Sequence, residues 1–317
     1  MSGDQGILDA FRSAVDETMR EMEAEMKTRV RMDLQDTDRT TGNMVWAEFI
    51  HTTSRPVDGV PDPQLHAHCF VFNTTWDEDE RRWKAGQFRE LKRDAPYFQA
   101  AFRVRLANHL QDLGFGVERK RDDFEIAGIP ADVLKRFSRR TALIEKVAGE
   151  RGIVDPDRKA ELGAETREKK GKALTWDSLR KEWNARLSGD EQESLAAVHR
   201  RENDVTKPEP AHKQAVNHAI EHSFVREAVV AERKLLTEGL KRGLGSVTVE
   251  AVAGELSQRH LIRSDVGGRG MATTQEMLAL ESRLVEFARL GRGRCRPLAD
   301  PARACSREWF TEGQKAV

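Results

Sequence analysis

The residues most able to do chemistry are two histidines separated by one residue, His66 and His68. They lie in the run 63–73, whose alternation predicts a β-strand. Side chains two residues apart on a strand share a face, so both imidazoles can turn toward one ion. The same spacing places Phe70 and Phe72 further along that face. The pattern therefore predicts a pair of metal ligands on one strand.

A third histidine, His51, ends a second strand-like run, 43–50. If the two runs pair in a sheet, three imidazoles converge, and three neutral imidazoles suit a divalent transition metal with open positions for substrate. Strand histidines also occur as ordinary core or surface residues, so the spacing alone leaves both interpretations open. Cys69 falls on the opposite face from the His66–His68 pair, where we interpret it as a small packing residue and not a ligand.

The composition is that of a hydrophilic, helix-leaning protein large enough for two domains or more. It has 317 residues, of which 33% are charged, and a mean hydropathy of −0.66. The 53 basic and 53 acidic residues cancel, so overall charge does not indicate a nucleic-acid binder. Local basic patches lie at 84–93, 119–121 and 135–140. Each of them could equally be an ordinary solvent-exposed face.

Targeting signals are not found in the sequence. No apolar run approaches the length of a membrane span, and residues 1–6 lack the pattern of a signal peptide. The cysteines are odd in number and widely spaced, at Cys69, Cys295 and Cys305. They favour a reducing compartment without a disulfide framework, so we expect a cytoplasmic protein with no membrane partner.

The first 150 residues mix helices and strands, which predicts an α+β layer domain. The expected order begins with helix 6–28, strand 28–32, polar loop 33–41, and two histidine-bearing strands joined by the proline-rich loop 54–63. An acidic turn at 77–80 and a helix at 87–113, bent or restarted near Pro96, follow. Short strands at 115–119 and 124–126 and a helix from Pro130 to about Val147 complete the order.

The remaining residues are more charged and more helical. Residues 148–175 predict a linker or a solvated helix, and Thr175 is expected to cap the next helix. Two or three short helices are expected in 212–260, where His218 and His222 form an i, i+4 pair that we interpret as a surface pair. Residues 307–317 resemble the start of another helix.

These motifs together resemble the TrwC/TraI-type (MobF class) conjugative relaxases. The matching stretch is His51-Thr52-Thr53-Ser54-Arg55, then Asp62-Pro63-Gln64-Leu65-His66-Ala67-His68, then Phe70 to Asn73. The likeness continues through 83–84, 128–130 and 137–140. Less specifically, 273–293 resembles the segment leading into the family's helicase, and 312–314 the glutamine motif before its phosphate-binding loop.

The resemblance implies an antiparallel-sheet relaxase domain of the HUH endonuclease-like type, incomplete at its N-terminus and followed by a helical accessory region leading to a helicase. The expected divisions are a partial relaxase domain at 1–150, a charged linker or helical segment at 151–210, and the helical N-terminal part of a RecD-like helicase region, truncated, at 211–317.

The resemblance also implies a site. His51, His66 and His68 would hold a divalent ion, magnesium or manganese, that polarises the scissile phosphate of single-stranded transfer-origin DNA. Three imidazoles alone would favour zinc, so the metal stays open. Arg55, Lys84 and Arg89 are the expected contacts to the DNA backbone. Relaxosome or other conjugation proteins are expected partners.

One departure from the family pattern concerns the nucleophile. The family's nucleophilic tyrosines precede the helix expected at 6–28, and Tyr97 is the only tyrosine here, at a position where the family has a packing aromatic. We therefore expect a relaxase fragment that binds metal and DNA without covalent nicking. Two alternatives stay open: a non-catalytic DNA-binding or scaffolding protein, and an unrelated three-histidine hydrolase with a metal-bound water as nucleophile.

Overall fold

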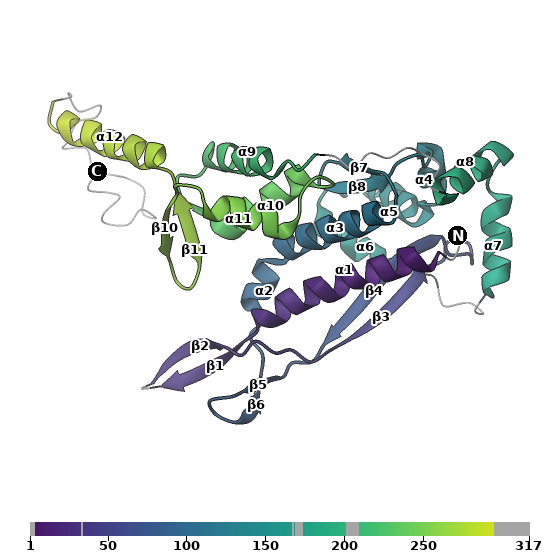
Figure 1. The fold of residues 1–317 in the computed structure, drawn as a ribbon, viewed down its shortest axis with the longest axis horizontal. Coiled ribbons are helices and arrows are strands. Elements are labelled where there is room, and N and C mark those ends of the chain that lie inside the picture. The colour runs from purple at the N-terminus through teal and green to yellow at the C-terminus, as the bar shows by residue number, and fades with distance from the viewer. Residues whose placement is uncertain (1–3, 33, 167, 169–173, 201–208, 295–317) are drawn as a thin grey trace. The chain divides into compact units, whose positions relative to one another are not determined.

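The computed structural model describes residues 4–32, 34–166, 168, 174–200 and 209–294. Contacts divide the chain into two units, one of residues 1–222 with 233–259, the other of 223–232 with 260–317. Figure 1 labels most of the elements of both units.

Two long helices form the framework of the first unit. Helix α1 (Gln5–Ala24) begins where the Asp4 carboxylate accepts a hydrogen bond from the Gly6 N–H, and α3 (Ala95–Asp112) has a proline in its first turn. Phe11 and Phe102 join the helices edge to face, with ring centroids 5.7 Å apart. Both helices bury apolar residues at helical spacing, among them Phe11, Val15 and Met19 in α1 and Phe98, Ala101 and Val104 in α3.

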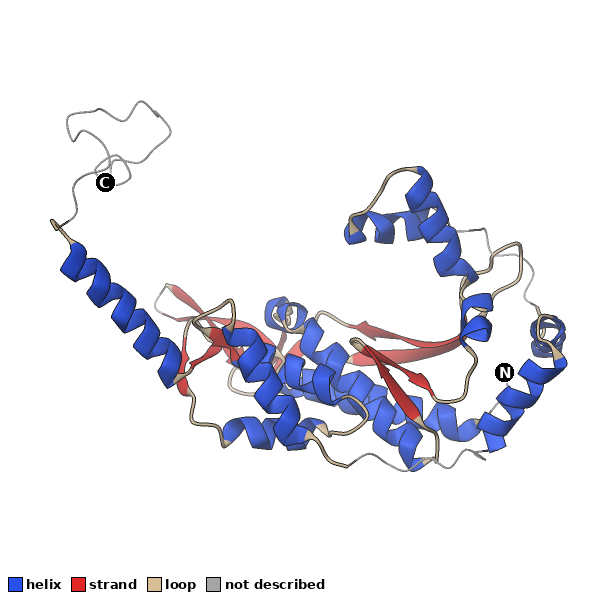
Figure 2. Cartoon of the chain, turned by 90° about the horizontal axis from the view of Figure 1, so that it is seen from above, coloured by secondary structure: helices blue, strands red, loops and turns tan. Residues whose placement is uncertain are grey.

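The strands of this unit form four antiparallel two-stranded ladders beside the helices (Figure 2). The ladders are β1 (Lys27–Met32) with β2 (Gln35–Thr40), β3 (Trp46–Thr53) with β4 (Pro63–Val71), β5 (Thr75–Asp77) with β6 (Arg82–Lys84), and β7 (Val117–Lys120) with β8 (Asp123–Ile126). Leu65, Ala67 and Cys69 on one face of β4 line a small cavity together with Phe11 and Val15 of α1, so this face packs toward the helices.

The other helices of the first unit cover or extend this framework. The Asn108 amide of α3 donates to the carbonyl of Val247, which ties α3 to the turn between α10 and α11. These helices are α2 (Arg89–Arg93), α4 (Ala131–Arg136), α5 (Arg139–Glu150), α6 (Pro156–Glu165), α7 (Trp176–Ala185), α8 (Gly189–Arg200), α9 (His212–Phe224), α10 (Glu232–Gly243) and α11 (Val249–Ser257), with α9 and α10 each sharing residues with the second unit.

The second unit is a small antiparallel sheet followed by a helix. Its strands β9 (Val230–Ala231), β10 (Ile262–Asp265) and β11 (Gly270–Thr273) lie in the order β10-β11-β9. Gly267 and Gly268 make the β10–β11 turn with positive φ, a conformation that favours glycine. Helix α12 (Gln275–Gly291) begins where the Thr274 hydroxyl accepts from the Met277 N–H. Across the described ranges of both units, no helix is long and apolar enough to cross a bilayer.

The α+β class with antiparallel pairing is confirmed, as are both histidine strands, the acidic 77–80 turn and the Thr175 cap. Helix 87–113 is interrupted at Asp94, before Pro96, into α2 and α3. The loop predicted at 33–41 is wrong, because residues 35–40 form β2. Its residues are mostly polar and exposed, so no buried face left a period in the sequence.

Three further expectations need correction. The helix expected from Pro130 to Val147 breaks at Phe137 and Ser138 into α4 and α5. The segment 148–175 contains α6, whose Leu162 is buried, so this helix is packed and not merely solvated. The region predicted to be helical after 211 contains the β10–β11 hairpin. The predicted helix at 307–317 and the motif at 312–314 lie outside the described residues.

Candidate metal centre on the β3–β4 ladder

The three histidines share one face of the β3–β4 ladder. The register places His51 opposite His66 and Phe49 opposite His68. The ring centroids are 5.3 Å apart for His51 and His66, 5.2 Å for His51 and His68, and 5.1 Å for His66 and His68. The strand pairing on which the three-histidine hypothesis depended is therefore confirmed.

The spacing of the rings fits a single metal ion, whereas their orientation requires adjustment. With a metal–nitrogen bond of about 2.1 Å, three imidazoles arranged tetrahedrally around one ion have ring centroids about 5.2 Å apart. Among the described residues, however, no three His, Cys, Asp or Glu side chains are already arranged to hold an ion. Rotation about the terminal torsion of a histidine is soft, so the rings can turn while the strands stay in place.

A backbone carbonyl orients one of these rings. The Nδ1 atom of His66 lies 3.1 Å from the carbonyl oxygen of Gln64. A carbonyl oxygen only accepts hydrogen bonds, so Nδ1 carries the proton in the neutral ring and Nε2 keeps its lone pair. Histidines that bind metals commonly donate their other ring nitrogen to a carbonyl in this way.

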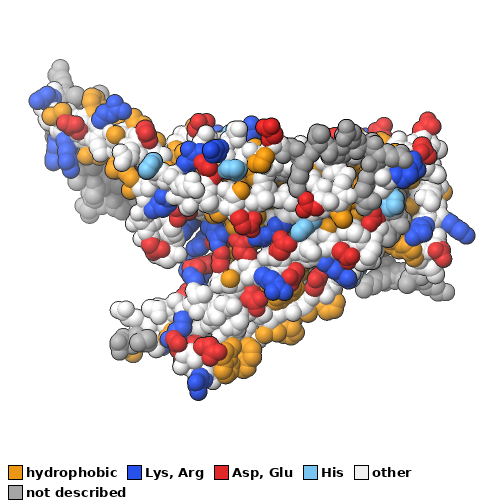
Figure 3. All heavy atoms as spheres, in the orientation of Figure 1, with side chains coloured by type: hydrophobic (Ala, Val, Ile, Leu, Met, Phe, Trp, Pro, Cys, Tyr) orange, Lys and Arg blue, Asp and Glu red, His pale blue; other side chains and the backbone are white. Residues whose placement is uncertain are grey.

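Exposed phenylalanines continue the histidine face. Phe49 is 57% exposed, Phe70 58% and Phe72 47%, although aromatic side chains are usually buried. Phe70 and Phe72 meet edge to face with ring centroids 4.9 Å apart. Trp83 on the β5–β6 hairpin is 58% exposed as well, and Figure 3 shows hydrophobic side chains gathered over β3 and this hairpin. Exposed aromatic rings such as these, beside the three histidines, are suited to stacking unpaired bases.

The opposite face of the ladder differs in character. Cys69 lies opposite Glu48 and away from the histidines, as predicted. Burial raises the pKa of the Cys69 thiol, and the neighbouring Glu48 carboxylate adds to this shift. A thiol held in its protonated form is a poor metal ligand, because metals bind the thiolate.

The model of the TrwC relaxase family matches residues 1–189, more than half of the chain. The chain belongs to the TrwC relaxase family. It is 33% identical over 159 residues to the multifunctional conjugation protein TraI of Escherichia coli (strain K12), a match that covers 47% of this chain and 9% of that protein. The chain thus matches less than a tenth of the length of its curated relatives.

Solved relaxase structures resemble this chain at the level of fold. A metal-bound complex of the conjugative relaxase TrwC with oriT DNA has a TM-score of 0.54 and 32% identity, covering 58% of this chain and 64% of that one. TrwC complexed with a 27-mer DNA comprising the recognition hairpin and the cleavage site has a TM-score of 0.55 and 31% identity, covering 61% of this chain and 68% of that one. The relaxase fold is therefore shown for this chain.

The only tyrosine of this TrwC-family chain is a packing residue, as predicted. Tyr97 is 4% exposed, and its hydroxyl donates to the Glu21 carboxylate. Burial, with Glu21 as a second cause, raises the pKa of Tyr97 well above its usual value. The Arg233 guanidinium lies 4.1 Å from the ring centroid. A buried phenol held protonated in this way cannot approach a phosphate.

The three basic residues expected to contact DNA lie on different elements of the chain. Arg55 is exposed in the loop that follows β3, four residues after His51. Lys84 lies on β6 and pairs with Asp77 at 3.4 Å and Glu80 at 2.6 Å, so its charge is largely compensated. Arg89 is the exposed first residue of α2. Their contact with DNA stays a prediction.

A buried aspartate near the candidate site was missed by the sequence analysis. Asp62, 3% exposed, accepts hydrogen bonds from the Arg139 backbone N–H at 3.0 Å, from Arg139 Nε at 2.9 Å and from Arg186 Nη1 at 2.8 Å. These partners are 77 and 124 residues away in sequence, so no local spacing could have indicated them. Asp62 had entered only as part of the family motif.

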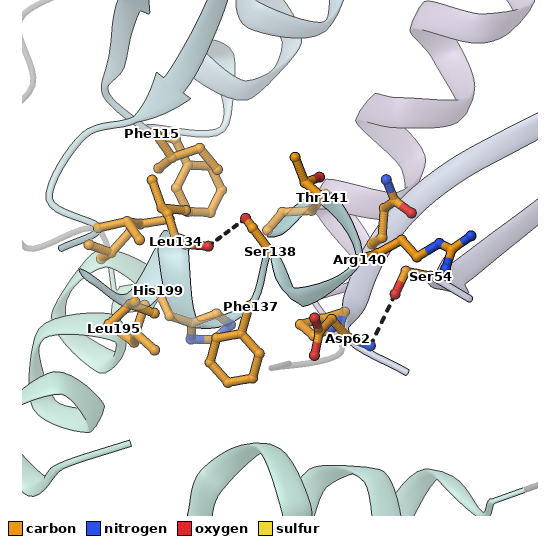
Figure 4. Close-up of a pocket in the computed structure, with 17 residues that line it drawn as sticks. Ser54, Asp62, Phe115, Leu134, Phe137, Ser138, Arg140, Thr141, Leu195 and His199 are labelled. Atoms are coloured by element: carbon orange, nitrogen blue, oxygen red, sulfur yellow. Dashed lines mark hydrogen bonds between the residues drawn. The ribbon is translucent and has the colours of Figure 1, made fainter. Parts of the chain in front are cut away.

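A cavity of about 530 Å³ lies beside Asp62 (Figure 4). Its wall is mainly apolar and includes Phe115, Leu134, Phe137 and Leu195, with Arg140 and His199 among the polar residues. None of the three strand histidines lines it. The candidate metal centre therefore lies on the exposed strand face and not in this cavity.

Proposed function

We propose that this chain binds single-stranded transfer-origin DNA around a divalent metal ion held by His51, His66 and His68. The observation that carries the proposal is the convergence of the three imidazoles on one exposed face, with ring centroids 5.1–5.3 Å apart. The DNA and the metal in the TrwC complexes, which are 31–32% identical to this chain, support it.

The residues on and near the ladder have different roles in the proposed binding of metal and DNA. The ion, when bound, neutralises charge on a phosphate of the DNA. His66 presents Nε2 because its Nδ1–H is held by the Gln64 carbonyl. Phe49, Phe70 and Phe72 offer ring faces on which unpaired bases can stack, irrespective of sequence. Arg55, Lys84 and Arg89 are proposed to attract the backbone.

Strand cleavage is a separate question from binding. A relaxase-type transesterification needs a tyrosine hydroxyl that can reach the phosphate. Tyr97 is buried and bonded to Glu21, so cleavage would require a tyrosine other than Tyr97. For the residues described here we propose metal and DNA binding. The predicted boundaries at 150 and 210, the helicase-leading role of 211–317 and the conjugation partners stay predictions.

Calorimetry with Mn²⁺, Zn²⁺ and Mg²⁺ tests the metal, and fluorescence anisotropy with an oligonucleotide of one hairpin and a single-stranded tail tests the DNA. We expect binding of at least one metal, tighter DNA binding in its presence, and loss of the metal in the triple variant His51→Ala, His66→Ala, His68→Ala. The matched control is His218→Ala with His222→Ala, two histidines stacked on α9. Unchanged metal affinity in the triple variant would contradict the proposed site.

A further inference from the structure

The loop between the two histidine strands is held by residues distant in sequence. Arg139 begins α5, and its Nη1 donates to the Val57 carbonyl at 3.1 Å while its Nη2 donates to the Val60 carbonyl. The indole Nε1 of Trp183 in α7 donates to the Pro61 carbonyl at 2.9 Å. The loop is therefore held by hydrogen bonds at three of its backbone carbonyls.

Asp62 is the centre of this arrangement. Its carboxylate receives Arg139 through both Nε and the backbone N–H, and Arg186 through Nη1. Two of these bonds join opposite charges, and the third places the carboxylate at the N-terminus of α5, where negative charge is favourable. Nearly complete burial of Asp62 makes the partners necessary, because a buried carboxylate without them is costly.

Asp62 also closes the histidine ladder. Its N–H donates to the Ser54 hydroxyl at 3.1 Å, a bond visible in Figure 4, and its carbonyl accepts from the Ser54 N–H at 2.9 Å. The next pair inward is Thr53 with Pro63, and the register shifts between Thr53 and His51. A ladder with an irregularity at this point depends on its closing contacts, because a slip of one residue turns side chains to the other face.

We propose that Arg139 and Asp62 are positioning residues for the histidine site. By fastening the 54–62 loop to α5, they fix the register that sets His51 opposite His66. This inference rests on the proposed function in one respect, that the histidines hold a metal. The positioning itself is a property of the protein without metal.

The first test compares Arg139→Ala with Arg140→Ala. Arg140 is the next residue of the same helix and also donates to two carbonyls, but to those of Gly163 and Thr166 and not to the loop. We expect Arg139→Ala to weaken binding of the metal that the wild type prefers by about 10–100-fold, the range for residues that orient metal ligands. Arg140→Ala should stay within about twofold of the wild type on the same scale.

The second variant is Arg139→Lys. It also replaces Arg139→Ala in the test if circular dichroism shows that Arg139→Ala does not fold. Lysine can keep the ion pair with Asp62, but its single ammonium cannot replace the guanidinium at both carbonyls. We expect an affinity between those of the wild type and Arg139→Ala. A folded Arg139→Lys or Arg139→Ala variant with wild-type metal affinity would overturn the proposal.

The second readout needs no metal and separates this inference from the proposed function. In protein with labelled histidines, Arg139→Ala should shift the ring resonances of His51 and His66 and leave those of His218 and His222 in place. If the wild type binds no metal, the proposed function is wrong. The His51 and His66 resonances still test whether Arg139 positions these two histidines. Unshifted His51 and His66 signals in the folded variant would refute the positioning role.

Discussion

The Nδ1 atom of His66 lies 3.1 Å from the backbone carbonyl oxygen of Gln64, two residues earlier on the same strand. This contact determines which ring nitrogen of neutral His66 carries the proton, because the acceptor is a backbone carbonyl of the same strand. It also separates the two nitrogens by role, since one is occupied by the backbone and the other keeps a free lone pair.

The neutral form of His66 should therefore carry its proton on Nδ1. Nitrogen-15 NMR of histidine-labelled protein, recorded where the imidazoles are neutral, distinguishes the two tautomers by the shifts of the ring nitrogens. We expect the Nδ1–H form for His66. An Nε2–H form would show that the hydrogen bond to Gln64 is not made in solution, and would remove one support for the proposed metal site.

Phe70→Ala should weaken DNA binding and leave the fold intact. The ring is 58% exposed, so its removal costs little stability, whereas a stacked base contributes about 1–3 kcal/mol. Anisotropy with a single-stranded oligonucleotide measures the first effect, and urea unfolding the second. Phe70→Trp should retain binding, and Val154→Ala, at a position 84% exposed, is the neutral control. Equal affinities of Phe70→Ala and wild type would exclude stacking at this ring.

The histidine site was predictable because its signal is local. Alternation in the run 63–73 places His66 and His68 on one face, and the family motif adds His51. The break between α4 and α5 has a cause that is not local. The Arg139 N–H at the start of α5 bonds to Asp62, 77 residues earlier, so a continuous helical pattern hid a real helix start.

Two other features of the structure also left no signal in the sequence. Arg233 lies over the ring of Tyr97, 136 positions earlier, and no sequence pattern announces such a contact. Strand β2 was not predicted for a different reason: its polar residues pair with β1, but neither face of β2 itself is buried enough to leave a hydrophobic period in the sequence. Local periodicity thus predicts which faces are buried, whereas polar contacts between residues distant in sequence can be found only in the structure.

Asp77→Asn should destabilise the protein at neutral pH, but not in acid. Burial opposes ionisation of Asp77, but hydrogen bonds from the Glu80 N–H, Arg39 and Lys84 outweigh it and hold the pKa of this carboxyl below its usual value. A lowered native pKa means that the stabilisation is present above the unfolded pKa of about 3.9 and is lost as the pH falls through the native pKa.

Urea unfolding of the wild type and Asp77→Asn from pH 7 to pH 3 measures this dependence. The two curves should differ at neutral pH and converge in acid. Asp79→Asn is the control, since Asp79 also pairs with Arg39, at 3.2 Å, but is 71% exposed and should contribute little. A constant difference between wild type and Asp77→Asn at all pH values would contradict the role assigned to the charge.

Leu162→Ala should lower the free energy of unfolding by about 2–5 kcal/mol, as for other buried leucines. Leu162 is 2% exposed in α6, within a stretch whose composition had suggested a linker. Chemical denaturation gives the value, with Val154→Ala as the exposed control from the same stretch. A loss below about 0.5 kcal/mol, typical of surface substitutions, would mean that α6 does not pack in solution.

Tyr97 should ionise only when the protein unfolds. It is the one tyrosine in the sequence, so the absorbance change at high pH reports on it alone. Because its pKa is raised in the folded state, its contribution to stability is complete below the unfolded pKa of about 10 and is lost as the pH rises above that value. The phenolate signal should therefore appear together with the loss of helical circular dichroism.

Tyr97→Phe isolates the hydroxyl in this last prediction. The substitution keeps a ring beneath Arg233, and Glu21 keeps its bond from Arg105 at 2.7 Å, so neither charge is left without a partner. We expect a loss of about 0.5–1.5 kcal/mol at neutral pH, the usual net value of one hydrogen bond, with metal and DNA affinities unchanged. A reversible titration of Tyr97 near its ordinary pKa in protein that stays folded would show that the ring is accessible, and would reopen the question of its chemistry.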